Sequence, residues 1–135
     1  MTIIYYIKLY LSTLAVFFLI DMVWLGVVAR ALYRKHLGFL LSPNPNWIAA
    51  ILFYLLWVAG LLVFAIVPGL QAVSIKKALL LGAFFGLLTY ATYDLTNQAT
   101  VKDWPFIITV VDLLWGTTLA TLVTAAGFYI GRWLS

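Results

Sequence analysis

Three aspartates lie inside or at the edge of long apolar stretches, namely Asp21, Asp94 and Asp112. A charged aspartate at the centre of a membrane helix costs about 2.5–3.5 kcal/mol even on the lenient insertion scale. Carboxyl groups that persist at such positions commonly mark ion or proton pathways or a ligand site, and a carboxyl group can also act as a general acid or base. The sequence therefore places any binding or chemistry at these three acids.

Two of these acids are expected at the same depth. Asp21 lies nine residues before Arg30, and Asp112 lies nine residues after Asp103. If their helices are antiparallel, a rise of about 1.5 Å per residue puts both carboxyl groups roughly 13 Å below the flanking charges on one membrane face. Asp94 is expected nearer to that face. Because crowded carboxyl groups in an apolar setting cannot all ionise, we expect at least one to be neutral at pH 7.

A tryptophan follows each of the two deep acids at the third position, as Trp24 and Trp115. Residues at i and i+3 share a helix face, so an indole N–H can serve the carboxylate region. A glycine shortly after each tryptophan would permit close helix approach. The likeness of the two segments fits either a divergent inverted repeat or one packing device used twice.

The candidate ligand-binding or polar-core residues combine the three acids with aromatic, amide and hydroxyl side chains expected near them. They are Asp21, Trp24, Tyr90, Asp94, Asn97, Thr109, Asp112 and Trp115. Deep aromatic residues beside acids resemble the lining of a site for an amphipathic molecule, although a packed core explains them about as well. The polar run at 92–100 could cap a helix or line the mouth of a pocket.

The sequence predicts neither a metal site nor a cofactor. Cysteine is absent, and the only histidine, His36, lies in a basic segment far in depth from the acids. We find no nucleophile elbow, no phosphate-binding glycine loop and no HExxH motif. These features favour a non-enzymatic role over an enzymatic one.

Composition predicts an integral membrane protein of the all-α class. Apolar residues make up 66% of the 135 residues and charged residues 9%, against roughly 25% charged in soluble domains. A span needs about 20 apolar residues, and we expect one domain with four spans at about 5–29, 47–67, 77–97 and 104–131. The first span exceeds the length of a signal-peptide core, so we expect it to be retained.

Breaks in the apolar pattern delimit the predicted four-helix bundle. Pro43 to Asn46 indicates a loop, and Pro68-Gly69 predicts a turn after the second span. The segment 30–41 could form a short amphipathic helix on the membrane surface or simply extend the first span. Gly82 and Gly86, four residues apart, predict a face for close helix packing or, alternatively, for dimer formation.

The basic residues are divided evenly between the two membrane faces. Lys8, Lys76, Lys77 and Arg132 fall on the side of the termini, and Arg30, Arg34, Lys35 and Lys102 fall on the other. The positive-inside rule therefore gives no orientation. The even count is also compatible with dual topology, in which two copies form an antiparallel dimer. The compact pair at 76–77 favours termini inside. The scattered charges form no stripe for nucleic acid.

The chain resembles a family of small bacterial four-helix membrane proteins known as domain of unknown function 2177. The resemblance rests on residues 93–100 followed by Trp104-Pro105, on Asp112-x-x-Trp115-Gly116, and on Asp21-x-x-Trp24-Leu25-Gly26 with Phe53-Tyr54. It covers nearly the whole chain. It implies a multi-pass protein of the bacterial inner membrane and carries no established activity, cofactor or catalytic residue.

Three functions remain open at this point. The first is binding or transport of a small amphipathic or lipid-like molecule, with membrane lipids and a second copy of the chain as partners, since four helices enclose little space alone. The second is an accessory or scaffold protein whose acids are hydrogen-bond hubs between helices. The third is a lipid-modifying enzyme that uses one aspartate as general acid or base.

Overall fold

The computed structural model describes residues 1–135, and every regular element in it is a helix. Four elements are long and apolar enough to cross a membrane, at Ile3–Val28, Trp47–Gln71, Ile75–Thr100 and Phe106–Leu134. The first comprises α1 (Ile3–Val23) and the π-helix η1 (Trp24–Val28), and the second comprises α3 (Trp47–Leu61), the π-helix η2 (Leu62–Ile66) and α4 (Val67–Gln71). The third is α5 (Ile75–Thr100) and the fourth is α6 (Phe106–Leu134). The predicted four-helix membrane fold is thus confirmed.

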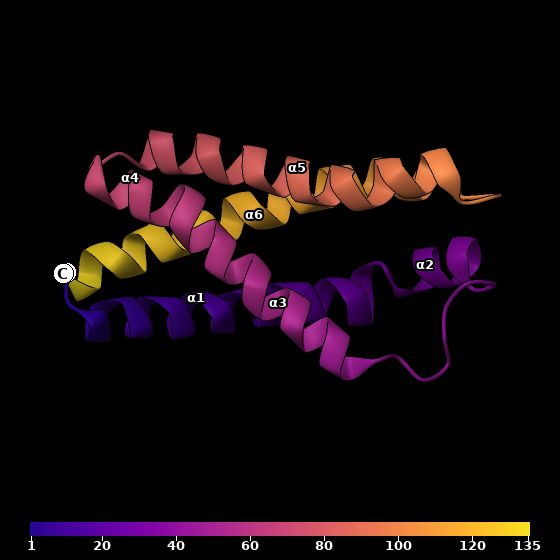
Figure 1. Ribbon diagram of the computed structural model, residues 1–135, viewed down its shortest axis with the longest axis horizontal. Helices are drawn as coiled ribbons and strands as arrows, with labels where there is room; N and C mark the ends of the chain where they lie inside the picture. The colour runs from indigo at the N-terminus through magenta and orange to yellow at the C-terminus, as the bar shows by residue number, and fades with distance from the viewer.

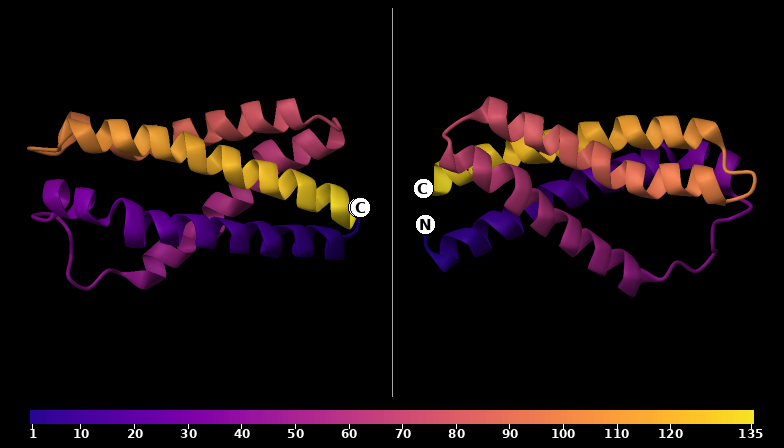
Figure 2. Two further views of the ribbon diagram at one scale, coloured as in Figure 1. Left: turned by 180° about the vertical axis from the view of Figure 1, so that it is seen from behind. Right: turned by 45° about the horizontal axis from the view of Figure 1, so that its top comes forward.

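The helices α1, α5 and α6 run along the long axis of the molecule, and α3 crosses them obliquely (Figure 1). The two ends of the chain lie together at one end of the bundle (Figure 2). The short helix α2 (Arg30–Leu37) lies at the opposite end, near the connection between α5 and α6. This arrangement places the acids of α1, α5 and α6 toward the end that carries α2.

Small residues set the close packing of α5 against α6. A methyl group added at Gly86 would collide with the backbone carbonyl of Gly116 and with Ala120, and one added at Gly82 would collide with Thr124. Both α5 glycines therefore pack against a helix of the same chain. The predicted packing face is found here, inside the monomer.

The second half of the α3 span is packed and its first half is not. Trp57, Leu61 and Ile66 are buried, and the Trp57 indole N–H donates to the Thr89 hydroxyl of α5 at 2.9 Å. The residues from Trp47 to Phe53 are almost all exposed, and Figure 2 shows this part diverging from the α5–α6 pair. The bundle is therefore more open at the end that carries α2.

The expected turn at Pro68-Gly69 is wrong, because both residues lie inside α4. Pro68 lies in the first turn of α4, just after the π-helix η2, and a missing N–H donor is tolerated in the first turn of a helix. The turn comes later, at Val73, whose φ of 49° is in the left-handed region. The Ser74 N–H donates to the Gly69 carbonyl across this turn at 3.0 Å.

The segment after the first span forms a helix of its own, α2, and the π-helix η1 and Ala29 separate it from α1. Ala29 has φ −105° and ψ −1°, which turns the chain between the two helices. Leu37 of α2 is buried in a small cluster with Trp104 and Ile108 at the start of α6. This contact holds α2 over the end of the bundle where the acids lie.

Candidate functional site

The two Asp-x-x-Trp segments of α1 and α6 meet through their tryptophans. The indole rings of Trp24 and Trp115 stack with centroids 4.2 Å apart and planes 7° apart. The Trp115 indole N–H points to the Asp21 carboxylate of α1, at 3.4 Å. Each helix thus contributes an acid and an aromatic ring, and the indole of α6 donates a hydrogen bond to the acid of α1.

Asp112 is held from the other side by a residue of α2. The Tyr33 hydroxyl donates to Asp112 Oδ1 at 2.5 Å and accepts from the Trp24 indole N–H at 3.2 Å. Burial raises the pKa of the Tyr33 phenol, and its hydrogen bond to Asp112 raises it further. The phenol therefore stays protonated and acts as the donor in this bond.

Asp94 is the one of the three acids that is buried without a hydrogen-bond donor. Its exposed fraction is 0%, and neither carboxyl oxygen accepts a hydrogen bond from a conventional donor. The Asp112 carboxyl of α6 lies close to it, with no hydrogen bond between the two side chains. Because two carboxylates so close together repel each other in an apolar interior, their surroundings favour a proton or a cation between them.

No basic side chain of the two helices is available to neutralise that pair. The sequence holds no Lys or Arg between Lys77 and Lys102, and none between Lys102 and Arg132. The Tyr33 hydroxyl is one of the few donors that reach the site, and it serves Asp112 rather than Asp94. The site is therefore electrostatically incomplete within the chain.

The acids occupy two neighbouring positions instead of one common cluster. Asp94 lies beside Asp112, whereas Asp21 is bound by the Trp115 indole. The three do not come together as a group that could hold a metal ion. The Tyr90 phenol lies within electrostatic range of both Asp21 and Asp112 and so bridges the two positions.

Two of the expected site residues lie elsewhere or contribute little. Thr109 is buried in a separate network, where its hydroxyl accepts from the Trp104 indole at 3.1 Å and donates to the Gln98 amide oxygen at 2.8 Å. That network ties the end of α5 to the start of α6. Asn97 is partly buried on α5 and its side chain makes no hydrogen bond to any of the acids.

Sequence reasoning missed Tyr33 and Gln98. Tyr33 was hidden in a basic segment expected at the membrane surface, but Ala29, Tyr33 and Leu37 form a stripe at spacing four that faces the bundle. That stripe was the available signal. Of the two glycines expected to permit close approach, Gly116 packs against the Tyr90 ring, whereas Gly26 has no neighbour within 4 Å. The expectation for Gly26 is therefore wrong.

These features define a small polytopic membrane protein with a carboxyl pair sealed inside its helix bundle. Residues 6–129 match the model of the family described as predicted membrane protein (DUF2177), and the chain belongs to that family. Comparisons with curated proteins and with solved structures each found no significant match.

Proposed function

We propose that the protein binds, and moves within the membrane, a small amphipathic molecule whose headgroup carries a positive charge. The headgroup would occupy the Asp94–Asp112 pair, with Tyr90, Asp21 and the two stacked indoles completing the surroundings. The protein would act in the inner membrane of a bacterium, where a second copy of the chain could enlarge the small space that four helices enclose.

The observation that carries this proposal is the state of Asp94. A buried carboxyl group without a donor costs several kcal/mol in an apolar medium, and Asp94 is fully buried with both oxygens free. A cationic headgroup would supply both the charge and the missing donors. A protein retains such a costly group most readily where a ligand uses it.

Entry to the pair would require α2 to move. Tyr33 is the α2 side chain that bonds to Asp112, and Leu37 of α2 packs against Trp104 and Ile108. The π-helix η1 precedes α2, and an exposed loop at 38–46 follows it. The exposed loop can change shape when α2 moves. The π-helix is a type of turn that often occurs at functional sites in helices.

A binding assay in detergent tests the proposal with three probes that share a ten-carbon chain: decylamine, decanol and decanoate. We expect decylamine alone to raise the unfolding temperature of the wild type. Asp94→Asn should abolish most of this increase, because it removes the charge and preserves the shape. Asp103→Asn, at an exposed loop acid, is the matched control and should respond like the wild type. Equal stabilisation by all three probes would refute the proposal.

A second candidate, a structural role for the acids, is favoured by the bonds of Asp21 and Asp112. Each of these accepts a hydrogen bond from an aromatic side chain of a different helix, Trp115 or Tyr33. The two roles predict opposite effects on stability. Asp94→Leu in the absence of any probe should raise the unfolding temperature if Asp94 serves a ligand, and a lower unfolding temperature would show that Asp94 stabilises the bundle as Asp21 and Asp112 do.

A further inference from the structure

Two concave surface features adjoin where the first span meets α2. One is a groove of about 500 Å³ lined only by apolar side chains, which are Leu19, Ile20, Val23, Trp24, Val28 and Trp115. The other is a shallow depression lined by Val27, Arg30, Ala31 and Arg34. Val28 lines the groove and Val27 lines the depression, so both features lie at the carboxyl end of the first span.

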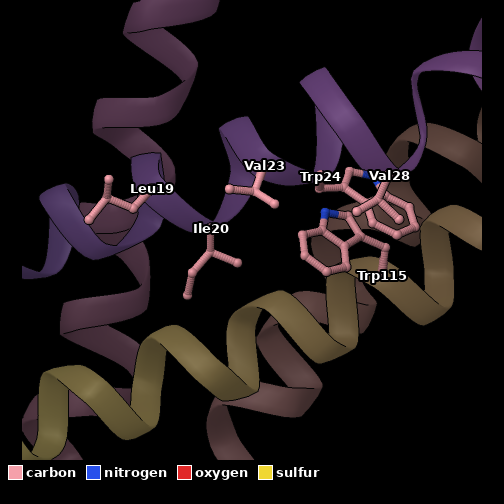
Figure 3. Close-up of a pocket in the computed structure, with 6 residues that line it drawn as sticks. All are labelled: Leu19, Ile20, Val23, Trp24, Val28 and Trp115. Carbon is pink, nitrogen blue, oxygen red and sulfur yellow. The ribbon is translucent and has the colours of Figure 1, made fainter.

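The apolar groove runs along the outside of the bundle between α1 and α6. Figure 3 shows Leu19 and Ile20 at one end and Val28 with the stacked indoles at the other. From Leu19 to Val28 the chain advances nine residues, which is roughly 14 Å of helix. That length is close to one hydrocarbon leaflet, which is about 15 Å thick. The groove thus suits an acyl chain that enters from the membrane surface.

The two arginines supply a charged end to this groove. Arg30 and Arg34 are four positions apart on α2, so they lie on one helix face, and both are exposed. Three of the four acids of the chain are buried in the bundle and the fourth, Asp103, lies in the connection between α5 and α6. Guanidinium groups bind phosphate oxygens through paired N–H donors, which makes them well suited to a lipid headgroup.

We infer that this composite surface is a binding site for an anionic phospholipid. The phosphate lies against Arg30 and Arg34, and one acyl chain lies in the groove over the Trp24–Trp115 stack. The site is on the lipid-facing outside of the bundle, and none of the three buried acids lines it. The lipid site can therefore be tested independently of the ligand proposed for the Asp94–Asp112 pair.

Native mass spectrometry of the purified protein tests this inference with two lipids that have identical dioleoyl chains. Dioleoylphosphatidylglycerol is anionic and dioleoylphosphatidylcholine is zwitterionic. We expect the wild type to retain the anionic lipid preferentially. In R30Q/R34Q this preference should fall about 30-fold, as expected for two basic residues near a membrane surface.

A matched pair of charge variants separates a specific site from general surface charge. Lys35 is also exposed on α2 but does not line the depression. R34Q should therefore weaken retention of the anionic lipid several-fold more than K35Q. Equal effects of R34Q and K35Q, or equal retention of both lipids by the wild type, would overturn the inference.

A second matched pair tests the acyl-chain groove. Val23→Trp fills the groove at a side chain that is already exposed, and Val63→Trp makes the same change at an exposed position on η2 outside it. Val23→Trp should reduce retention of both lipids and Val63→Trp should not. A lipid-free dimer in the wild type would show that a second copy covers the groove, and would also overturn the inference.

Discussion

The indole rings of Trp24 and Trp115 lie face to face between α1 and α6, 4.2 Å apart. Through this stack the two Asp-x-x-Trp segments are held at one level, with Asp21 bound by the indole of α6 and Asp112 bound by Tyr33, which Trp24 supports. The stack is therefore a helix–helix contact whose two indoles also take part in the hydrogen bonding around Asp21 and Asp112.

Loss of either indole should remove a spectroscopic signal that depends on both. Parallel indoles at this distance couple their excited states, so we expect an exciton couplet in the far-ultraviolet circular dichroism spectrum. Trp24→Phe and Trp115→Phe should each abolish the couplet and destabilise the protein by about 1 kcal/mol. Trp133→Phe is the control, since Trp133 is 83% exposed. A couplet that survives in both single variants would contradict the stacked geometry.

Tyr33→Phe should lower stability although it removes only one oxygen atom. The variant leaves Asp112 and the Trp24 indole without their shared partner. We expect a loss of about 1 kcal/mol, the usual size for an interhelical hydrogen bond in a membrane protein. Thermal unfolding in detergent measures the effect, and Tyr129→Phe, at an exposed position on α6, should have none. Equal unfolding temperatures for the wild type and Tyr33→Phe would contradict the assigned role.

Helix content, the number of spans and the identity of the deep acids could all be predicted from the sequence. They depend on local composition and on distance along a helix, which the spacing of Asp21 and Asp112 from the flanking charges encodes. The pairing of Asp94 with Asp112 could not be predicted, because it depends on the rotation of α5 about its axis. That rotation is set by contacts such as Gly86 against Gly116.

The role of α2 was hidden for a related reason. A basic amphipathic segment satisfies the pattern of a surface helix equally well whether or not one residue reaches inward. Tyr33 reaches Asp112 only because η1 and Ala29 turn the chain back over the bundle. Hydropathy does not reveal the two π-helical segments, and one of them, η2, ends just before the short helix α4 that contains Pro68.

The two glycines Gly86 and Gly26 should respond in opposite ways to the same substitution. Gly86→Ala places a methyl group against the carbonyl of Gly116 and should cost about 1–3 kcal/mol by forcing α5 away from α6. Gly26→Ala meets no neighbour and should be neutral or stabilising by up to about 1 kcal/mol. Thermal unfolding of both variants in one detergent gives the comparison. A Gly86→Ala protein as stable as the wild type would mean that α5 and α6 are further apart.

The orientation of the protein should depend on very few charges. Four basic residues lie on the side of the termini and four on the other. In K76Q/K77Q the balance becomes two against four, and basic residues remain preferentially in the cytoplasm. If the termini of the wild type are inside, as the pair at 76–77 favours, we therefore expect them to move to the external side.

Fusions of the carboxyl terminus to a fluorescent protein, active in the cytoplasm, and to alkaline phosphatase, active outside it, measure this change in a bacterial host. The wild type should favour fluorescence and K76Q/K77Q should favour phosphatase activity. The matched variant K35Q/K102Q removes two charges from the opposite side and should increase fluorescence. A ratio of the two signals that is unchanged in both variants would show that the even division of charge does not govern topology.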